Sequence, residues 1–352
     1  MQLEPPFWWY GERIPLAAWA LWPISAAYGE IGKRRFRTAS PYRSTLPVIC
    51  VGNFTMGGAG KTPVALKLAS LLQETGRKPG FLTRGYGGSE RGPHLIDCAS
   101  DGADRVGDEP LLLARAAPTV VSRDRPAGAK LLETLGVDAI IMDDGFQNPS
   151  IEKDFSVAVV DGGAGLGCGQ VFPLGPLRAP LALQIGMADA VVILGSQDQA
   201  DVARLIKQKS LRSAPLPIFS ARIVPRVSDE LRGRTFVAFC GIGRPAKFFD
   251  TLREAGIAVA KSRSFPDHHP YTEADARSLL ADAKALDAGL ITTEKDYARL
   301  KGAEGLLGEL YRSAVALQIS VEFSGGGEAR LMQFLAASSS RNGLAPEIAS
   351  HV

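Results

Sequence analysis

Short apolar runs alternate with helical and glycine-rich segments along most of the chain. Apolar runs predict strands at residues 48–51, 79–83, 119–122, 139–142, 156–160, 190–194 and 218–223. Apolar residues at helical spacing follow the first run, and helices are predicted at 111–116 and 124–135. This alternation predicts an α/β fold in which helices cover both faces of a parallel sheet. Ligands are then expected at the carboxyl ends of the strands.

A second, shorter α/β series begins near Thr235. It has predicted strands at 236–240, 258–262 and 289–292, and a helix at 272–286 that Thr272 and Asp275 open as a capping box. A strand at 315–323 and a helix at 328–337 come last, before a polar tail that we expect to fray. Segments 89–109 and 161–187 read as loops.

These patterns predict four parts of the chain. They are an N-terminal helix (1–40), a first α/β domain (41–224), a smaller α/β domain (225–314) and a return strand and helix (315–340). The strands at 218–224 and 315–323 bracket the smaller domain, so we expect them to pair as a two-stranded hinge and the last helix to dock on the first domain. Rocking about this hinge would bring His268 towards Asp108.

The glycine-rich segment 47–64 joins the first strand to a helix. Glycines allow backbone N–H groups to converge on phosphate oxygens, and a helix N-terminus adds partial positive charge. The segment therefore predicts a phosphate-binding loop, with Lys61 on the phosphates and the Thr62 hydroxyl on Mg²⁺. The candidate nucleotide-binding residues are Thr55, Gly57, Gly58, Ala59, Gly60, Lys61 and Thr62.

The loop departs from the standard phosphate-binding pattern, because Thr55 stands where the first glycine is expected. Its paired glycines, Gly57 and Gly58, resemble the Gly-Gly-x-Gly-Lys-Thr subtype. One function that this subtype allows is that of a membrane-associated ATPase acting as a nucleotide switch, and we keep it as the alternative to an enzyme that transfers phosphate. Many proteins of that kind carry an additional lysine where Met56 stands here, which argues against the switch.

Carboxylates follow two of the predicted elements of the first domain. Asp143 and Asp144 end an apolar strand, where a carboxylate can hold Mg²⁺ opposite Thr62. Asp108 lies in a predicted loop between strand and helix, where it can take the proton of an attacking hydroxyl. The alternatives are a turn or cap role for the pair and a simple helix-terminal charge for Asp108.

Histidines and arginines supply further candidates. Asp267 precedes the adjacent His268 and His269, one of which can support a catalytic carboxylate, although a structural role is also open. Zinc is disfavoured, because no cysteine or third histidine accompanies the pair. Arginines at predicted loops after strands suit phosphate recognition: Arg84, Arg123, Arg125 and Arg178. Lys295 either faces the site or joins an exposed salt bridge.

Composition narrows the classes of partner. The 352 residues are 45% hydrophobic and 22% charged, with a net charge of +3, which is ordinary for a globular protein and gives no nucleic-acid-like charge balance. Four scattered cysteines without a C-x-x-C pattern favour reduced thiols in a cytosolic protein.

All four tryptophans lie in the first 22 residues, beside the basic cluster Lys33, Arg34, Arg35 and Arg37. The uncharged run 14–28 is too short to span a bilayer, and the charges follow it, which argues against a secretory signal. Such a segment suits a helix lying at an anionic membrane surface. The alternative is a helix packed on the first domain.

Seven motifs in order resemble those of the tetraacyldisaccharide 4′-kinases of lipid A synthesis. They lie at residues 51–63, 84–87, 107–110, 143–147, 175–178, 265–269 and 292–296. The resemblance implies a lipid kinase, a transferase with a P-loop fold, that moves phosphate from ATP·Mg²⁺ to the 4′-hydroxyl of a tetraacylated glucosamine disaccharide 1-phosphate. It also implies peripheral attachment to the cytoplasmic face of the inner membrane. We expect a monomer.

The resemblance also assigns roles to particular residues. It implies Asp108 as the catalytic base with His268 in support, Lys61 and Thr62 on ATP and Mg²⁺, and Asp143 and Asp144 near the metal. Arg84, Arg125 and Arg178 are the expected substrate contacts. The family often has Glu after Pro-Leu-Arg, where this chain has Ala179. Alanine has no carboxylate, so the contact to metal or substrate that a glutamate would make at this position is not expected from Ala179.

Overall fold

The computed structural model describes residues 5–11, 13–195, 202–204, 206 and 216–339. By its contacts the chain divides into two compact units. The first unit contains Met1–Arg84, Asp124–Arg222 and Val321–Val352, and the second contains Gly85–Arg123 and Ile223–Ser320. The predicted domain boundaries placed residues 85–123 with the first domain, whereas the contacts group them with the second unit. The tail expected to fray, from residue 340 on, lies outside the described residues.

The first unit is built on parallel strands. Its elements are η1 (Phe7–Trp9), η2 (Leu16–Leu21), α1 (Trp22–Thr38), β1 (Val48–Asn53), α2 (Lys61–Glu74), β2 (Pro79–Thr83), α5 (Arg125–Glu133), β5 (Ala139–Asp143), β6 (Phe155–Asp161), α6 (Leu181–Met187), β7 (Ala190–Leu194) and α12 (Gly327–Ser339). The strand order is β8-β7-β6-β1-β5-β2, and β8 (Ile218–Arg226) pairs with β7 through its first residues.

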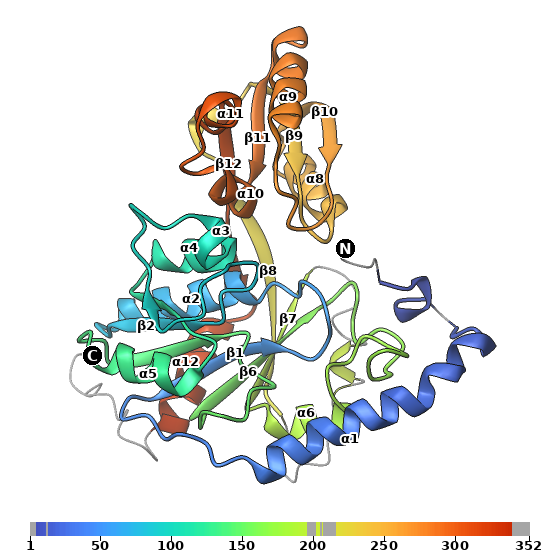
Figure 1. Cartoon of the computed structure of the whole chain (residues 1–352), viewed down its shortest axis with the longest axis vertical. Coiled ribbons are helices and arrows are strands. Elements are labelled where there is room, and N and C mark those ends of the chain that lie inside the picture. Colours follow the sequence, from blue (N-terminus) through green and yellow to red (C-terminus); the bar gives the residue numbers. More distant parts are fainter. Residues whose placement is uncertain (1–4, 12, 196–201, 205, 207–215, 340–352) are drawn as a thin grey trace. The chain divides into compact units, whose positions relative to one another are not determined.

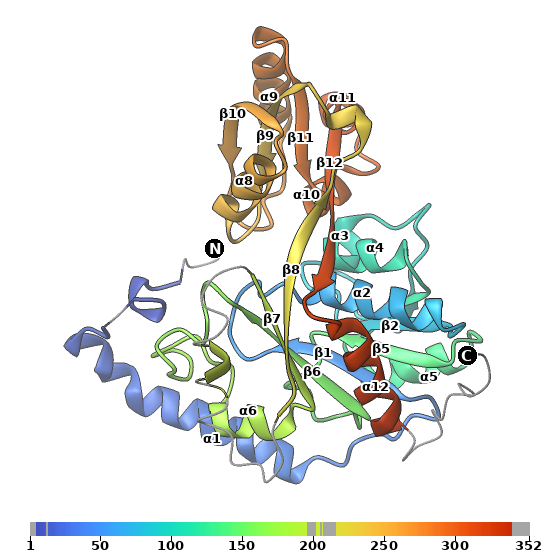
Figure 2. The same cartoon turned by 180° about the vertical axis from the view of Figure 1, so that it is seen from behind.

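Every neighbouring pair in this sheet is parallel, with β1 near the centre. All residues of β1, β5 and β6 are buried, because helices cover both faces. The helix α5 lies in front of the strands in Figure 1, and α12 lies in front of them in Figure 2. The predicted α/β fold with a covered parallel sheet is confirmed.

Close backbone packing fixes the central strand. A Cβ at Gly52 of β1 would lie 2.3 Å from the Cβ of Phe146, so only glycine lets the ring of Phe146 pack there. Phe146 then stacks edge-on against Phe54, at 5.6 Å between ring centroids. This contact joins the end of β1 to the segment that follows β5.

The second unit has its own strands and core. Its elements are β3 (His94–Leu95), α3 (Ala103–Val106), α4 (Asp108–Ala114), β4 (Thr119–Val121), η3 (Asp229–Leu231), β9 (Thr235–Cys240), α8 (Pro245–Glu254), β10 (Ala258–Ser264), α9 (Glu273–Ala285), β11 (Gly289–Thr293), α10 (Glu294–Leu300) and α11 (Gly305–Ser313). The strands β10, β9, β11 and β12 (Ala314–Phe323) run parallel in that order, and β3 pairs with β4 in antiparallel fashion.

Two neighbouring strands, β8 and β12, each pass from one unit to the other. They contact each other on both sides of the boundary: Arg222 Nη2 lies 2.9 Å from Glu322 Oε2, and the Ser320 hydroxyl donates to the Val224 carbonyl at 3.4 Å. After β12 the chain continues into α12, where Glu328 pairs with Lys67 of α2 at 2.9 Å.

Several predicted loops contain helices. Residues 161–187 include α6, residues 89–109 include α3 and the start of α4, and α8 was not predicted. The capping box at Thr272 and Asp275 is present at the start of α9, as predicted.

Candidate active site

The loop after β1 has the backbone that a phosphate-binding loop requires. Gly60 has φ of 84°, a left-handed conformation that favours glycine, and α2 begins at the next residue, Lys61. Gly57 and Gly58 are exposed, and a Cβ at either residue would meet no atom within 4 Å, so the loop is open there. The amide of buried Asn53 donates to the carbonyls of Thr55 and Gly57 at 2.7 and 3.2 Å, which holds the loop in shape.

The predicted metal and phosphate residues lie together beside this loop. The Thr62 hydroxyl donates to Asp143 Oδ2 at 3.5 Å, and Lys61 Nζ lies 3.7 Å from Asp144 Oδ1. Asp144 has φ of 51°, an unusual backbone for a residue other than glycine. Burial acts to raise the pKa of Asp144, but the charges of Lys61 and Arg178 outweigh it and the pKa is lowered. The neighbouring cations therefore keep Asp144 ionised.

Arg178 braces this cluster. Its Nη1 donates to Asp144 Oδ1 at 2.9 Å and its Nε donates to the Thr55 carbonyl at 3.0 Å. The backbone continues the link, since the N–H groups of Arg178 and Met56 donate to Phe54 and Pro176 at 2.9 and 2.7 Å. Arg178 therefore contacts both the loop after β1 and Asp144.

The other two predicted substrate arginines differ from each other. Arg84 is exposed directly after β2. Arg125 is the first residue of α5, inside the helix predicted at 124–135, but it is only 2% exposed and so does not lie on an open loop. Burial lowers the pKa of Arg125 to about 10, against the raising effect of Asp144 and Asp143. Its buried charge belongs to the same acidic cluster.

Two glutamines that sequence reasoning missed tie the loop in place. Gln147 Nε2 donates to the Asn53 carbonyl at 2.7 Å and to Gln184 Oε1 at 2.8 Å. Gln184, fully buried on α6, donates to the carbonyls of Ala179 and Phe54 at 2.8 and 3.2 Å. Gln147 ends the motif at residues 143–147. Gln184 lies in no motif, and its helix falls in the segment 161–187 that was predicted as a loop. Ala179, which stands where the family often has Glu, thus contributes its backbone carbonyl to the hydrogen bond with Gln184.

The second unit holds the candidate base. Asp108 is the first residue of α4, rather than a loop residue, and is 3% exposed. Its Oδ1 accepts the N–H of Glu109 at 2.8 Å. Its Oδ2 lies 3.3 Å from His268 Nδ1 and accepts from Arg299 Nε at 2.9 Å and from Nη2. Burial acts to raise the pKa of Asp108, but the hydrogen bond to His268 and the nearby cations leave it well below its usual range.

The two adjacent histidines have different partners. His268 has φ of 55°, contacts Asp108 and lies 5.3 Å from the ring of Tyr86. The hydrogen bond to Asp108 raises the pKa of His268 above its ordinary value. His269 Nε2 instead lies 3.0 Å from Asp275 Oδ2, beside the cap of α9. The geometry thus pairs His268, rather than His269, with Asp108.

Contact between His268 and Asp108 requires no movement of one unit against the other. Both residues belong to the second unit. The expectation that hinge rocking brings these two side chains together is therefore wrong. Lys295, the other residue left open by the sequence, pairs with Glu109 next to this site.

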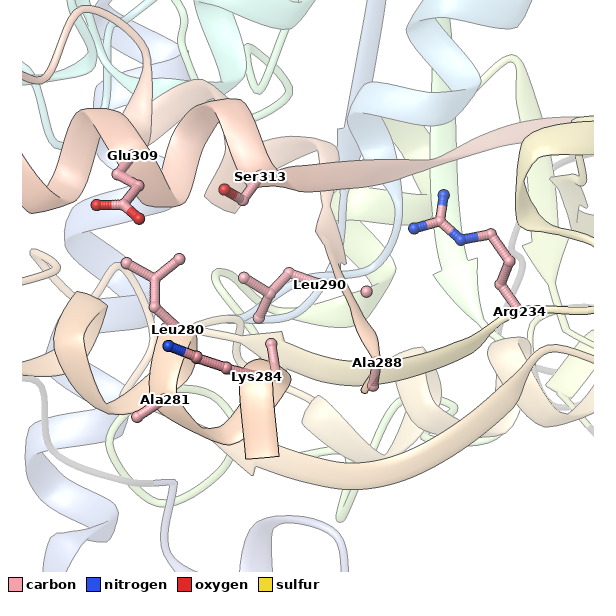
Figure 3. Close-up of a pocket in the computed structure, with 10 residues that line it drawn as sticks. Arg234, Leu280, Ala281, Lys284, Ala288, Leu290, Glu309 and Ser313 are labelled. Carbon is pink, nitrogen blue, oxygen red and sulfur yellow. The ribbon is translucent and has the colours of Figure 1, made fainter. Parts of the chain in front are cut away.

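A separate hollow of about 480 Å³ lies among α9, α11 and β11 of the second unit. Figure 3 shows Lys284 and Glu309 at its rim and Leu280 and Leu290 on its wall. None of the predicted site residues lines this hollow. This hollow is therefore distinct from the loop after β1 and from the Asp108 cluster.

Comparison with known proteins gives one consistent family. The family model described as LpxK, tetraacyldisaccharide-1-P 4′-kinase, matches residues 17–338. The chain is 52% identical over 300 residues to the tetraacyldisaccharide 4′-kinase of Methylobacterium radiotolerans, covering 85% of this chain and 90% of the relative. It is 46% identical over 323 residues to that of Chelativorans sp., covering 92% of each.

A solved structure agrees with these relatives. The "apo" form of LpxK from Aquifex aeolicus, in complex with ATP, superposes with a TM-score of 0.71 at 26% sequence identity. The match covers 92% of this chain and 99% of that one.

Proposed function

The chain belongs to the tetraacyldisaccharide-1-phosphate 4′-kinase family, and from this premise we propose how its own residues carry out the reaction. It is a lipid kinase of lipid A biosynthesis that transfers a phosphoryl group from ATP to the 4′ position of the acylated disaccharide. The single observation that carries the mechanism is the open glycine loop, with Lys61 and Thr62 beside two aspartates.

The first unit fits a magnesium-bound nucleotide. The open face at Gly57 and Gly58 leaves room for phosphate oxygens against backbone N–H groups, and α2 begins at Lys61. Thr62, Asp143 and Asp144 offer the oxygen ligands that Mg²⁺ prefers. When bound, the metal ion neutralises charge on the transferred group. Lys61 and Arg178 orient the phosphates and add positive charge.

Asp108 orients the 4′-hydroxyl and takes its proton. Oδ1 bonds only one backbone N–H among the described contacts, so it is the oxygen suited to the acceptor, whereas Oδ2 is held by His268 and Arg299. As the new O–P bond forms and the bond to the leaving ADP breaks, the hydroxyl proton passes to the Asp108 carboxylate. His268 keeps that carboxylate ionised beforehand.

The N-terminal segment supports attachment to a membrane surface. It leaves large apolar side chains exposed: Phe7 (77%), Leu16 (91%), Trp22 (55%), Ile24 (58%) and Ile31 (62%). Within the described ranges, every helix falls short of the length and hydrophobicity that a bilayer crossing requires. On the exposed apolar side chains, we propose peripheral attachment to the cytoplasmic face of the inner membrane, where ATP and the acylated substrate are both accessible. We also propose that the protein is a monomer.

The two strands that cross between the units support a hinge. Because β8 and β12 are neighbours and both continue into each unit, bending them moves the second unit without unfolding either core. In this proposal the hinge carries Asp108 and His268 together, as a preformed pair.

Transfer of labelled phosphate from ATP to the acylated disaccharide tests the function. We expect label in the lipid, with ATP turnover that depends on the disaccharide. A nucleotide switch would hydrolyse ATP at the same rate with or without the lipid, and that result would overturn the proposed mechanism.

A further inference from the structure

Arg299 on α10 contacts three separate parts of the second unit. Its Nε and Nη2 donate to Asp108 Oδ2 on α4, with Nε at 2.9 Å. Its Nη1 donates to the Gly241 carbonyl at 2.7 Å and to Asp296 Oδ1 at 2.6 Å. The side chain is only 10% exposed. A planar guanidinium held on both edges has little freedom, so its position fixes the position of Asp108.

Asp296, which accepts a hydrogen bond from Arg299, is itself held by several hydrogen bonds. Asp296 is fully buried and accepts from the Gly241 N–H at 2.9 Å, the Tyr271 hydroxyl at 2.9 Å and the Thr293 hydroxyl at 2.6 Å. A buried carboxylate requires such partners, because an unpaired one is costly in a dry interior. The Arg299 guanidinium therefore links the hydrogen-bonded carboxylate of Asp296 to the carboxylate of Asp108.

The Gly241 carbonyl, which binds Arg299, also orients the loop that carries His268. The Gly241 carbonyl accepts the His268 N–H at 3.0 Å as well as Arg299 Nη1. A Cβ at Gly241 would lie 3.1 Å from the Pro266 carbonyl, so this contact is tight. Arg299 thus fixes the carboxylate of Asp108 and the backbone of His268 with respect to each other.

We propose that Arg299 is a positioning residue for phosphoryl transfer, which holds Asp108 Oδ2 against His268 and leaves Oδ1 for the acceptor hydroxyl. This inference rests on the proposed role of Asp108 as the proton acceptor. Arg299 would not touch the substrate and would act through Asp108.

The charges around Asp108 agree with this role. The charged and titratable groups of the surrounding elements are Asp108, Glu109, Asp267, His268, Tyr271, Lys295, Asp296 and Arg299. Burial acts to raise the pKa of Asp108, while the His268 hydrogen bond and then the Arg299 charge lower it. Without Arg299 the pKa of Asp108 moves upward, and the carboxylate form is lost at a higher pH.

A double-mutant cycle on the full-length enzyme tests the proposal. The variants are Arg299→Met, Asp108→Asn and the double variant, assayed for transfer to the acylated disaccharide. We expect Arg299→Met to lower kcat about 100-fold, as misplacing a reacting group does, with KM for ATP unchanged. Its acidic limb of the pH–rate profile moves to higher pH. In the Asp108→Asn background the same change has little further effect, because Arg299 acts through Asp108.

Two conservative variants complete the design. Arg299→Lys keeps the charge but cannot span Asp108 and Gly241, so it recovers part of the lost kcat. Arg253→Lys changes an arginine that is 76% exposed on α8 and leaves kcat unaltered. If Arg299→Met fails to fold, Arg299→Lys with Asp108→Asn supplies the same cycle.

The outcomes separate the inference from the proposed function. Unchanged kcat in Arg299→Lys and Arg299→Met, or losses that simply multiply with that of Asp108→Asn, would overturn the positioning role. Full transfer by Asp108→Asn would instead contradict the role of Asp108 itself, and would overturn both proposals.

Discussion

At the scale of single residues, Lys61 is more enclosed than its place in a glycine loop suggests. It is 9% exposed, begins α2 and lies 3.7 Å from Asp144. A lysine on an exposed loop would face solvent, whereas Lys61 is buried at the start of α2. Its ammonium group is therefore held towards the acidic cluster rather than free in water.

Lys61→Met should lower phosphoryl transfer by about 100- to 1,000-fold, because one charge that stabilises the transferred group is lost. The methionine keeps the apolar stem, so the fold should remain. Lys67→Met on the same helix, which removes the Glu328 ion pair instead, serves as the control in transfer assays at saturating ATP. Equal activity in the two variants would contradict the assignment of the loop.

The pair of Asp108 and His268 makes a prediction about pH. The pKa of His268 is raised, so its protonated form stabilises the folded protein fully below about pH 6.5 and that contribution is lost as the pH rises through the raised value. The lowered pKa of Asp108 acts oppositely: its contribution is present above about pH 3.9 and is lost as the pH falls.

Proton NMR of the imidazole groups measures this directly. The His268 signal, assigned with His268→Gln, should titrate above about pH 6.5 and should shift to a lower midpoint in Asp108→Asn. A midpoint that Asp108→Asn leaves in place would mean that the contact does not set the protonation of His268.

Residue types and order predicted much of the candidate site. The motifs singled out five candidate site residues: Lys61, Thr62, Asp143, Asp144 and Asp108. Each stands in a short motif whose adjacent residues mark its function. Other contacts depend on pairs far apart in the chain, such as Arg299 with Asp108, separated by 191 positions. No local pattern encodes such a contact, and a buried arginine reads like any other in sequence.

At the scale of elements, the N-terminal segment is bound to the first unit on one side and exposed on the other. The indole N–H groups of Trp8 and Trp9 donate to the carbonyls of Leu174 and Pro173, each at 3.1 Å. In α1, Ser25 and Gly29 are the buried positions, whereas Ile24, Tyr28 and Ile31 share an exposed face. The segment therefore packs on the first unit, as the alternative expected, and also leaves apolar side chains exposed; its attachment to a membrane surface stays a prediction.

Replacing Trp22, Ile24 and Ile31 by Ser should weaken binding to anionic vesicles about 100-fold, on the basis of roughly 1 kcal/mol for each partly inserted side chain. Vesicle flotation measures the bound fraction. Leu286→Ser, at an exposed apolar position of the second unit, is the matched control and should bind as the wild type does. Retained binding in the triple variant would place the attachment surface elsewhere.

Gly52 gives a prediction about the central strand. Gly52→Ala places a methyl group 2.3 Å from the Cβ of Phe146, so backbone or ring must shift. Overpacking of this kind costs about 1–3 kcal/mol of stability. Urea denaturation measures it, with Gly32→Ala as control, since a Cβ there meets nothing within 4 Å. Equal stability of the two variants would show that the strand yields without cost.

Strands were easier to predict than short helices. Buried parallel strands read as continuous apolar runs, and β1, β5 and β7 were therefore located closely. The helices α3 and α6 have only 4 and 7 residues, too few for a helical period to emerge. Tertiary contacts stabilise them, such as the bonds from Gln184 of α6 to Phe54 and Ala179.

At the scale of the whole molecule, each unit has its own buried cluster. The first unit includes Phe54, Phe146 and Val191 in one cluster, and the second includes Phe239, Tyr271 and Leu310 in another. A ligand of the first unit should therefore stabilise that unit by itself.

Hydrogen exchange with and without ATP·Mg²⁺ tests this independence. At 100 times the dissociation constant, binding adds about 2.7 kcal/mol of stability. We expect slower exchange in β1, α2 and β5, with β9 and β11 unchanged, and no effect in Lys61→Met. Equal protection in both units would mean that they open as one cooperative body.

The chain crosses between the units four times, after Arg84, Arg123, Arg222 and Ser320. Neither unit is a continuous stretch of sequence, so order of synthesis matters. The ribosome delivers the nucleotide loop early, but β12, which crosses between the units, and α12 of the first unit emerge long after it. The Asp108 cluster likewise waits for Arg299. Nascent chains shorter than about 320 residues therefore carry two unfinished cores at once, which exposes apolar surface to chaperones until β12 and α12 have emerged.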